Sequence, residues 1–252
     1  MFIGKGNDVF VKALIVTLFS LFIFIDSISV LPRLVASDNG SNALGASLQA
    51  MANTIKRFSL VLIAPLLGIL AMTETLQALV ATVIVAFTVG IAVFVITTLK
   101  NGVFKFLFEK LLSMLIEKNI SIRKLGTSVM DSLRIPREGF RLAVFSFDKK
   151  KIDAEVRALS IFIFTLYANA VFIINIMARV YSDISSVLLQ MSGVVTALGT
   201  ILMAFWLDPI LARSYDTRDD SYKKVQSLLQ GKFISLILST GMYATYYLYI
   251  TR

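Results

Sequence analysis

Two adjacent basic residues, Lys56 and Arg57, stand near the middle of the apolar stretch Ala43–Leu70. As one helix rising about 1.5 Å per residue, this stretch would place both charges roughly 20 Å from either end, too deep for both side chains to reach the headgroups. Ionisable residues at such a depth usually face a bundle interior or a water-filled cavity. The pair therefore predicts a site within the membrane that handles an anion or a polar substrate.

The same stretch has an alternative interpretation, in which Ala43–Arg57 lies flat on the membrane and only Phe58–Met72 enters the hydrocarbon. The second segment is shorter than the ~20 residues of a spanning helix, so this alternative requires a re-entrant hairpin. The sequence leaves both arrangements open.

A buried charge needs a partner, and Asp26 in the preceding apolar stretch is the nearest candidate. Its carboxylate could neutralise Lys56 or Arg57 when no substrate is bound. A permanent structural ion pair is the alternative, because breaking a buried pair is strongly unfavourable.

Composition identifies the environment of these residues. Of the 252 residues, 57% are hydrophobic and 16% are charged, as is typical of an integral membrane protein. The apolar residues form six continuous runs, which indicate helices rather than the short alternating strands of a barrel. The predicted spans are approximately Val9–Leu31, Ala43–Leu70, Thr75–Leu99, Leu159–Met177, Ser186–Leu207 and Phe233–Ile250.

The first run could instead be a signal peptide, because Lys5 and Lys12 precede its apolar residues and Val35–Ser37 resembles a weak cleavage site. Val9–Leu31 is long for a signal core, however, and contains Asp26. These features favour a retained helix.

The connection between the third and fourth spans contains most of the basic residues outside the spans. Residues 100–157 hold thirteen of the 25 lysines and arginines. With six spans, this connection shares a side with the loops Pro32–Asn42 and Asp208–Lys232. The positive-inside rule, which applies best to short loops, places this side in the cytoplasm and both termini outside.

Part of this connection has the pattern of an amphipathic helix. Lys105, Glu109, Lys110 and Lys118 share one face, and the other face is apolar. The apolar positions are Phe104, Leu107, Phe108, Leu111, Leu112 and Leu115. We expect the helix to lie on the cytoplasmic leaflet, where the connection's net charge of +6 would attract anionic phospholipids. No recognition motif accompanies this charge, so nucleic acid is not an expected partner.

The chain divides into a membrane half at 1–99, the basic connection at 100–157 and a second membrane half at 158–252. Three spans in each half give the halves opposite orientations, as in inverted-repeat transporters. A weak sequence similarity between the halves supports this arrangement, because Pro65 and Pro209 follow Ser47 and Ser192 at similar spacing. Pro65 should kink or end the second span, and Pro209 should mark the exit from the fifth.

The chain contains no histidine and no cysteine. This absence excludes thiol chemistry and the usual zinc and haem sites, and no phosphate-binding loop or dinucleotide turn occurs. Asp26, Asp183 and Asp208 stand apart in the sequence, without the clustering of a two-metal site. We therefore expect no cofactor, no metal and no enzymatic activity.

Several short motifs in the first, second and fifth spans together resemble one family, the Amj-type lipid II flippases. The motifs are Ile25–Ser27 with Arg33, Ser47–Leu48 with Arg57, Ala64–Gly68, and Met191–Leu202 leading to Asp208–Pro209. The resemblance covers most of the chain except Lys100–Arg157, where nothing matches position by position. Asn53–Lys56 departs from the more apolar pattern of that helix, which leaves the role of Lys56 open.

This resemblance implies that the protein carries the undecaprenyl-linked peptidoglycan precursor, lipid II, from the inner to the outer leaflet of a bacterial cytoplasmic membrane. The residues are suited to that task, since a pyrophosphate needs a hydrated path with cationic groups through hydrocarbon. A potential negative inside favours outward movement of an anion by ~2.3 kcal/mol per charge per 100 mV. The candidate substrate-binding residues are Arg33, Lys56, Arg57, Asp26 and Asp208.

Two other classes of function stay open. A membrane enzyme acting on a polyprenyl phosphate or a phospholipid would need a metal or nucleophile at Asp26, Asp183 and Asp208. A scaffold subunit would use the buried charges only to pair with a partner protein. The bundle is small for so large a headgroup, which favours a homodimer.

Overall fold

The structure, a computed structural model, describes residues 5–117, 127, 144–145, 152–218 and 220–252. Nearly all of these residues are helical, and no strand occurs among them. Six segments are long and apolar enough to cross a bilayer: Asp8–Asp38, Asn42–Thr73, Leu76–Leu99, Ala154–Val180, Ser182–Thr217 and Ser221–Ile250. The prediction of an all-α polytopic membrane protein with six spans is confirmed.

Several spans consist of more than one helix. The first half contains α1 (Lys5–Ile28), α2 (Leu31–Asp38), α3 (Asn42–Thr73) and α4 (Leu76–Leu99), followed by α5 (Asn101–Ile116). The second half contains α7 (Ala154–Val180), the 3₁₀ turn η2 (Ser182–Ile184), α8 (Ser185–Leu202), the π-helical turn η3 (Met203–Leu207), α9 (Asp208–Thr217) and α10 (Ser221–Ile250).

The basic pair lies on one uninterrupted helix, because α3 runs from Asn42 to Thr73 and continues through Pro65. The alternative with a surface helix and a re-entrant hairpin is therefore wrong, and Pro65 does not end the span. Pro209 also departs from expectation. It lies in the first turn of α9, where its missing N–H is tolerated, and the helical path continues to Thr217.

The two halves have the same packing order. In the first half α1 packs against both α3 and α4, which scarcely touch each other, and in the second half α7 packs against both α8 and α10. The halves meet where α4 packs on α10 and where α3 packs on α7. This repeated order agrees with two inverted halves, although the repeat itself stays a prediction.

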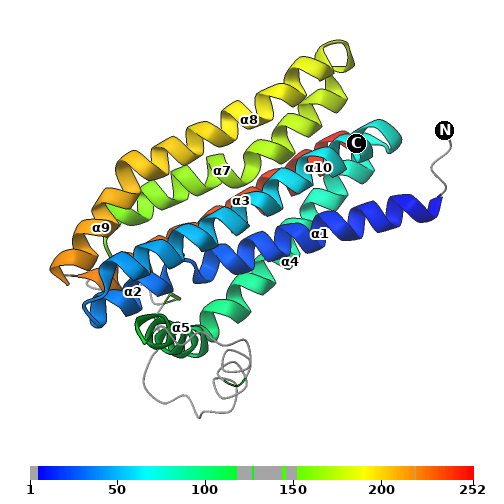
Figure 1. Cartoon of the computed structure of the whole chain (residues 1–252). Coiled ribbons are helices and arrows are strands. Elements are labelled where there is room, and N and C mark those ends of the chain that lie inside the picture. The colour runs from blue at the N-terminus through cyan, green and yellow to red at the C-terminus, as the bar shows by residue number, and fades with distance from the viewer. Residues whose placement is uncertain (1–4, 118–126, 128–143, 146–151, 219) are drawn as a thin grey trace.

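The six spans place the two ends of the described chain together. The beginning of α1 and the end of α10 lie at one end of the bundle, whereas α2, α5 and α9 lie at the other (Figure 1). We call these the termini end and the α5 end. An even number of spans places the first and last helix ends on the same side of a membrane, in agreement with this arrangement.

The predicted amphipathic helix is present as α5, and it packs on the protein. Leu112 is buried against Val35 and Ala36 of α2. Lys105 Nζ lies 3.4 Å from an Asp38 carboxylate oxygen and donates a hydrogen bond to the Tyr222 hydroxyl. Burial alone would lower the pKa of Lys105, but these contacts outweigh it and raise that pKa above its ordinary value. Most of the remaining connection lies outside the described residues.

A close approach of α7 and α10 positions part of the site. A Cβ at Gly231 would lie 2.7 Å from the Arg157 carbonyl oxygen, so only glycine allows the two helices to come so near. The Ser160 hydroxyl donates a hydrogen bond to the Leu228 carbonyl across the same contact, at 2.8 Å. The neighbouring residue, Lys232, is thereby held inside the bundle.

Candidate functional site

A buried network of three charges joins α1, α3 and α10. Each carboxylate oxygen of Asp26 forms an ion pair with one lysine. Oδ1 lies 2.7 Å from Lys56 Nζ, and Oδ2 lies 2.7 Å from Lys232 Nζ. Lys232 also donates to the Asp26 carbonyl oxygen at 3.2 Å. All three side chains are almost completely buried. We call Asp26, Lys56 and Lys232 the ion triad.

The ion triad lies deep in the bundle. Lys56 and Lys232 stand roughly 16–21 Å along their helices from the α5 end, which is near the centre of a ~30 Å hydrocarbon layer. Each ammonium also lies over an aromatic ring, Lys56 over Tyr167 at 5.6 Å and Lys232 over Phe164 at 5.8 Å. The negative ring faces help to stabilise two cations that share a single carboxylate.

Asp208 and Arg33 adjoin the ion triad on the side of the α5 end. Asp208 lines a small cavity of about 20 Å³ together with Lys56 and Lys232, and its charge also interacts with those of Arg33 and Arg57. The Arg33 guanidinium lies over the Tyr215 ring at 5.3 Å, and its buried Nε has no hydrogen-bond partner within the described part of the chain. The five predicted site residues therefore gather in one region.

This region has an excess of positive charge. Asp26 and Asp208 provide two negative charges, while the lysines of the ion triad, with Arg33 and Arg57, provide four positive charges. An uncompensated positive charge within a membrane is unfavourable unless water or an anion stabilises it. The cluster is therefore suited to an anionic ligand.

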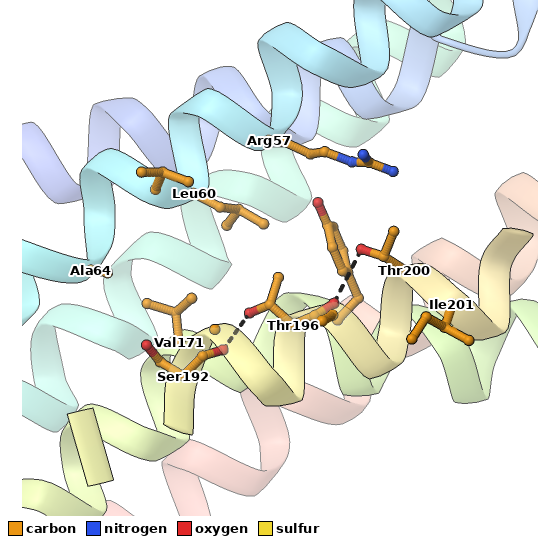
Figure 2. A pocket seen from close by; sticks show the side chains of 12 residues that line it. Arg57, Leu60, Ala64, Val171, Ser192, Thr196, Thr200 and Ile201 are labelled. Carbon is orange, nitrogen blue, oxygen red and sulfur yellow. Dashed lines mark hydrogen bonds between the residues drawn. The ribbon is translucent and has the colours of Figure 1, made fainter. Parts of the chain in front are cut away.

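Arg57 is the most exposed cation of this cluster. Its side chain is exposed, and no carboxylate lies within 4 Å of it among the residues that the structure describes. It lines a pocket of about 530 Å³ between α3, α7 and α8. Figure 2 shows Arg57 reaching from α3 toward the wall that holds Thr196 and Thr200. A guanidinium in such a pocket can bind phosphate oxygens through its N–H groups.

The opposite wall of the pocket contains a row of hydroxyl groups from α8. Ser192, Thr196 and Thr200 each donate to a carbonyl of their own helix, at 2.8, 2.8 and 3.1 Å, and their oxygens stay able to accept. Figure 2 marks the bonds of Thr196 and Thr200. The Tyr167 hydroxyl in the same pocket has no hydrogen-bond partner among the described residues. The pocket is thus apolar along its length, with polar groups at a few points.

The pocket opens sideways between two spans. It separates α3 from α8, which packs extensively on α7 and is largely exposed elsewhere. We call this feature the lateral groove. In a bilayer, a lipid could place its polar group in the lateral groove while its hydrocarbon chain stays among the surrounding lipids.

The structure corrects two assignments of charged residues. The expected partners of Asp26 were Lys56 or Arg57, and the partners in the structure are Lys56 and Lys232. Lys232 was assigned to the loop before the sixth span, but α10 begins at Ser221 and places Lys232 inside the bundle. Val225, Leu228 and Leu229 precede Lys232 at helical spacing and could have revealed that the helix begins earlier.

The metal cluster required by the enzyme alternative is not assembled. Asp183 lies in η2 at the termini end and is exposed, whereas Asp26 and Asp208 lie near the ion triad. Within the described ranges, no group of three His, Cys, Asp or Glu side chains could hold a metal ion.

Comparison of the chain with protein-family models, with curated proteins and with solved structures finds no match. The resemblance to the Amj-type flippases therefore depends on the sequence motifs, and it contributes to a proposal for the function.

Proposed function

We propose that the protein is a flippase for an anionic isoprenoid-linked lipid, with lipid II as the substrate that the sequence motifs favour. One observation carries the proposal: Arg57, exposed and with no described carboxylate within 4 Å, lies at mid-membrane depth in a groove that opens between two spans. Such a position suits a lipid phosphate that crosses the membrane while its isoprenoid chain remains in hydrocarbon.

The size of the lateral groove fits part of the substrate. A volume of about 530 Å³ lies within the range of ~300–1,000 Å³ that is usual for small-molecule sites. It can enclose a pyrophosphate with its nearest sugar, while the rest of a larger headgroup extends through the opening. A homodimer, with a second copy against the exposed face of α8, would enlarge the enclosed space.

The ion triad has a different role in this proposal. Both buried lysines are paired with the Asp26 carboxylate, so Lys56 is not free to bind a phosphate in the described arrangement. The triad joins α1, α3 and α10 and holds Arg57 at the neighbouring position of α3. Its positive charges, with Arg33, also make the potential in the lateral groove more favourable for an anion.

We further propose that the protein lies in a bacterial cytoplasmic membrane with the α5 end in the cytoplasm. The absence of natural cysteine allows a test with single substitutions at two exposed positions. In intact cells, Thr73→Cys should react with a membrane-impermeant thiol reagent, because it lies at the termini end. Ser113→Cys on α5 should react only after the cells are opened. The reverse pattern would invert the orientation.

The flippase proposal is tested by transport in liposomes that contain only the purified protein and fluorescent lipid II. We expect movement of lipid II between leaflets that depends on the protein and on Arg57. Liposomes in which the folded protein gives no movement above that of protein-free liposomes would contradict the proposal.

A further inference from the structure

The lateral groove continues beyond the pocket at Arg57 toward the termini end. A second cavity, of about 300 Å³, lies between the same three helices. Its lining residues are Gly68, Ala71 and Met72 of α3, Ala178 and Arg179 of α7, and Ser182, Ser185, Ser186 and Leu189 near the start of α8. We call this the outer cavity. One seam between α3, α7 and α8 therefore contains two pockets, each with an arginine.

Three polar side chains of the outer cavity, those of Arg179, Ser185 and Ser186, have no partner among the described residues. Arg179 is exposed, and no carboxylate within the described ranges lies within 4 Å of it. The Ser185 and Ser186 hydroxyls make no hydrogen bond to described residues. Asp183 is nearby in sequence, but its carboxylate contacts the Ser182 hydroxyl at 3.5 Å and does not line the cavity. A guanidinium and two hydroxyl groups together can donate hydrogen bonds to the oxygens of a phosphate.

A buried amide between the two pockets is also incompletely paired. Asn175 is 1% exposed, and its Nδ2 donates to the Val171 carbonyl at 2.8 Å, while its Oδ1 has no partner in the described part of the chain. That oxygen lies 3.9 Å from the position that a Cβ would take at Gly68, in the wall of the outer cavity. Buried polar atoms are normally satisfied, and Asn175 lines neither pocket, so a donor from the groove would have to reach this oxygen past Gly68.

The two arginines are too far apart to hold one phosphate together. Along α3, the segment from Arg57 to Met72 rises roughly 22 Å. A phosphate bound at Arg57 must therefore leave that residue before it reaches Arg179.

We propose that the outer cavity is a second phosphate-binding site, which receives the isoprenoid-linked phosphate after it leaves Arg57. Arg179, Ser185 and Ser186 bind the phosphate oxygens, and Asn175 Oδ1 accepts a hydrogen bond from a hydroxyl or amide group of the headgroup as it passes. This inference rests on the proposed flippase function and names where its substrate binds before release.

The test measures binding rather than transport. The full chain in phosphatidylcholine nanodiscs is irradiated with undecaprenyl pyrophosphate that carries a photoreactive diazirine on its first isoprene unit, and cross-linked peptides are mapped by mass spectrometry. We expect one group of cross-links around Arg57 on α3 and another where α7 ends and α8 begins. Arg179→Gln should reduce the second group at least tenfold and leave the first unchanged. Arg252→Gln, at an exposed position of the termini end, is the matched control and should change neither.

Competition separates the sources of phosphate. The outer cross-links should persist in a tenfold excess of phosphatidylglycerol and of inorganic pyrophosphate over the probe. Their loss to either competitor, or their absence from the unmodified chain, would overturn the inference. Loss of the outer group alone would leave the flippase proposal intact, because the cross-links at Arg57 report on that site. Both groups of cross-links without transport in liposomes would overturn the flippase proposal and leave the outer cavity as a phosphate-binding site alone.

Discussion

Replacement of Asp26 by alanine is expected to lower the free energy of unfolding by about 3–5 kcal/mol, because it leaves two buried ammonium groups without a carboxylate. In the intact protein both oxygens of Asp26 are occupied, by Lys56 and by Lys232. The substitution removes both contacts at once and leaves two like charges in the same low-dielectric site. Reversible unfolding of the purified protein in mixed micelles gives the measurement.

Removal of all three charges should reverse most of this loss. Asp26→Ala combined with Lys56→Met and Lys232→Met replaces the ion triad by apolar groups, which is often neutral or stabilising. Asp183→Ala, at an exposed carboxylate, is the matched control and should change stability little. If the effects of the three triad substitutions simply add, the residues do not interact as the structure indicates. Arg57→Ala should give no relief, since Arg57 is not a partner of Asp26.

Arg57→Ala is expected to abolish growth of a bacterium in which this protein is the only lipid II flippase. The substitution removes the exposed guanidinium of the lateral groove, while the ion triad that joins α1, α3 and α10 stays intact. Charge-assisted hydrogen bonds contribute about 1.5–3 kcal/mol, so transport should fall about 10- to 100-fold. Growth is measured together with the amount of protein in the membrane, which should be normal.

Two further variants distinguish binding from stability. Arg57→Lys should keep part of the activity, because lysine retains the charge but loses the planar fork that binds two phosphate oxygens. Because Lys56 is buried against Asp26, we expect Lys56→Ala to lower the amount of folded protein rather than transport alone. Normal growth of the Arg57→Ala strain at ordinary expression would remove Arg57 from the substrate path.

Much of the fold could be predicted from the sequence because the bilayer restricts what apolar stretches can form. The six spans, the amphipathic helix at α5 and the depth of Lys56 and Arg57 all follow from hydrophobic length and helical rise. The gathering of Arg33, Asp26 and Asp208 near the basic pair agrees with the candidate site.

Other features depend on packing between distant helices. Lys232 stands just before an apolar run, and the close contact of α10 with α7 at Gly231 buries it. Tyr167 and Asn175 are ordinary polar residues of an apolar helix in the sequence, and their unpaired atoms appear only when α3 and α7 are placed side by side. No local sequence pattern predicts the lateral groove, because it lies where α3 and α8 are separated from each other.

The central claim is that Arg57 in the lateral groove serves the passage of lipid II, and transport by the pure protein tests it most directly. Liposomes of phosphatidylcholine containing fluorescent lipid II are treated with a membrane-impermeant quencher, and the loss of inner-leaflet signal reports movement. We predict rapid loss with the unmodified protein, about 10- to 100-fold slower loss with Arg57→Ala, and no protein-dependent loss for fluorescent phosphatidylcholine. Equal rates for the unmodified protein and folded Arg57→Ala, or no movement of lipid II with either, would contradict the account.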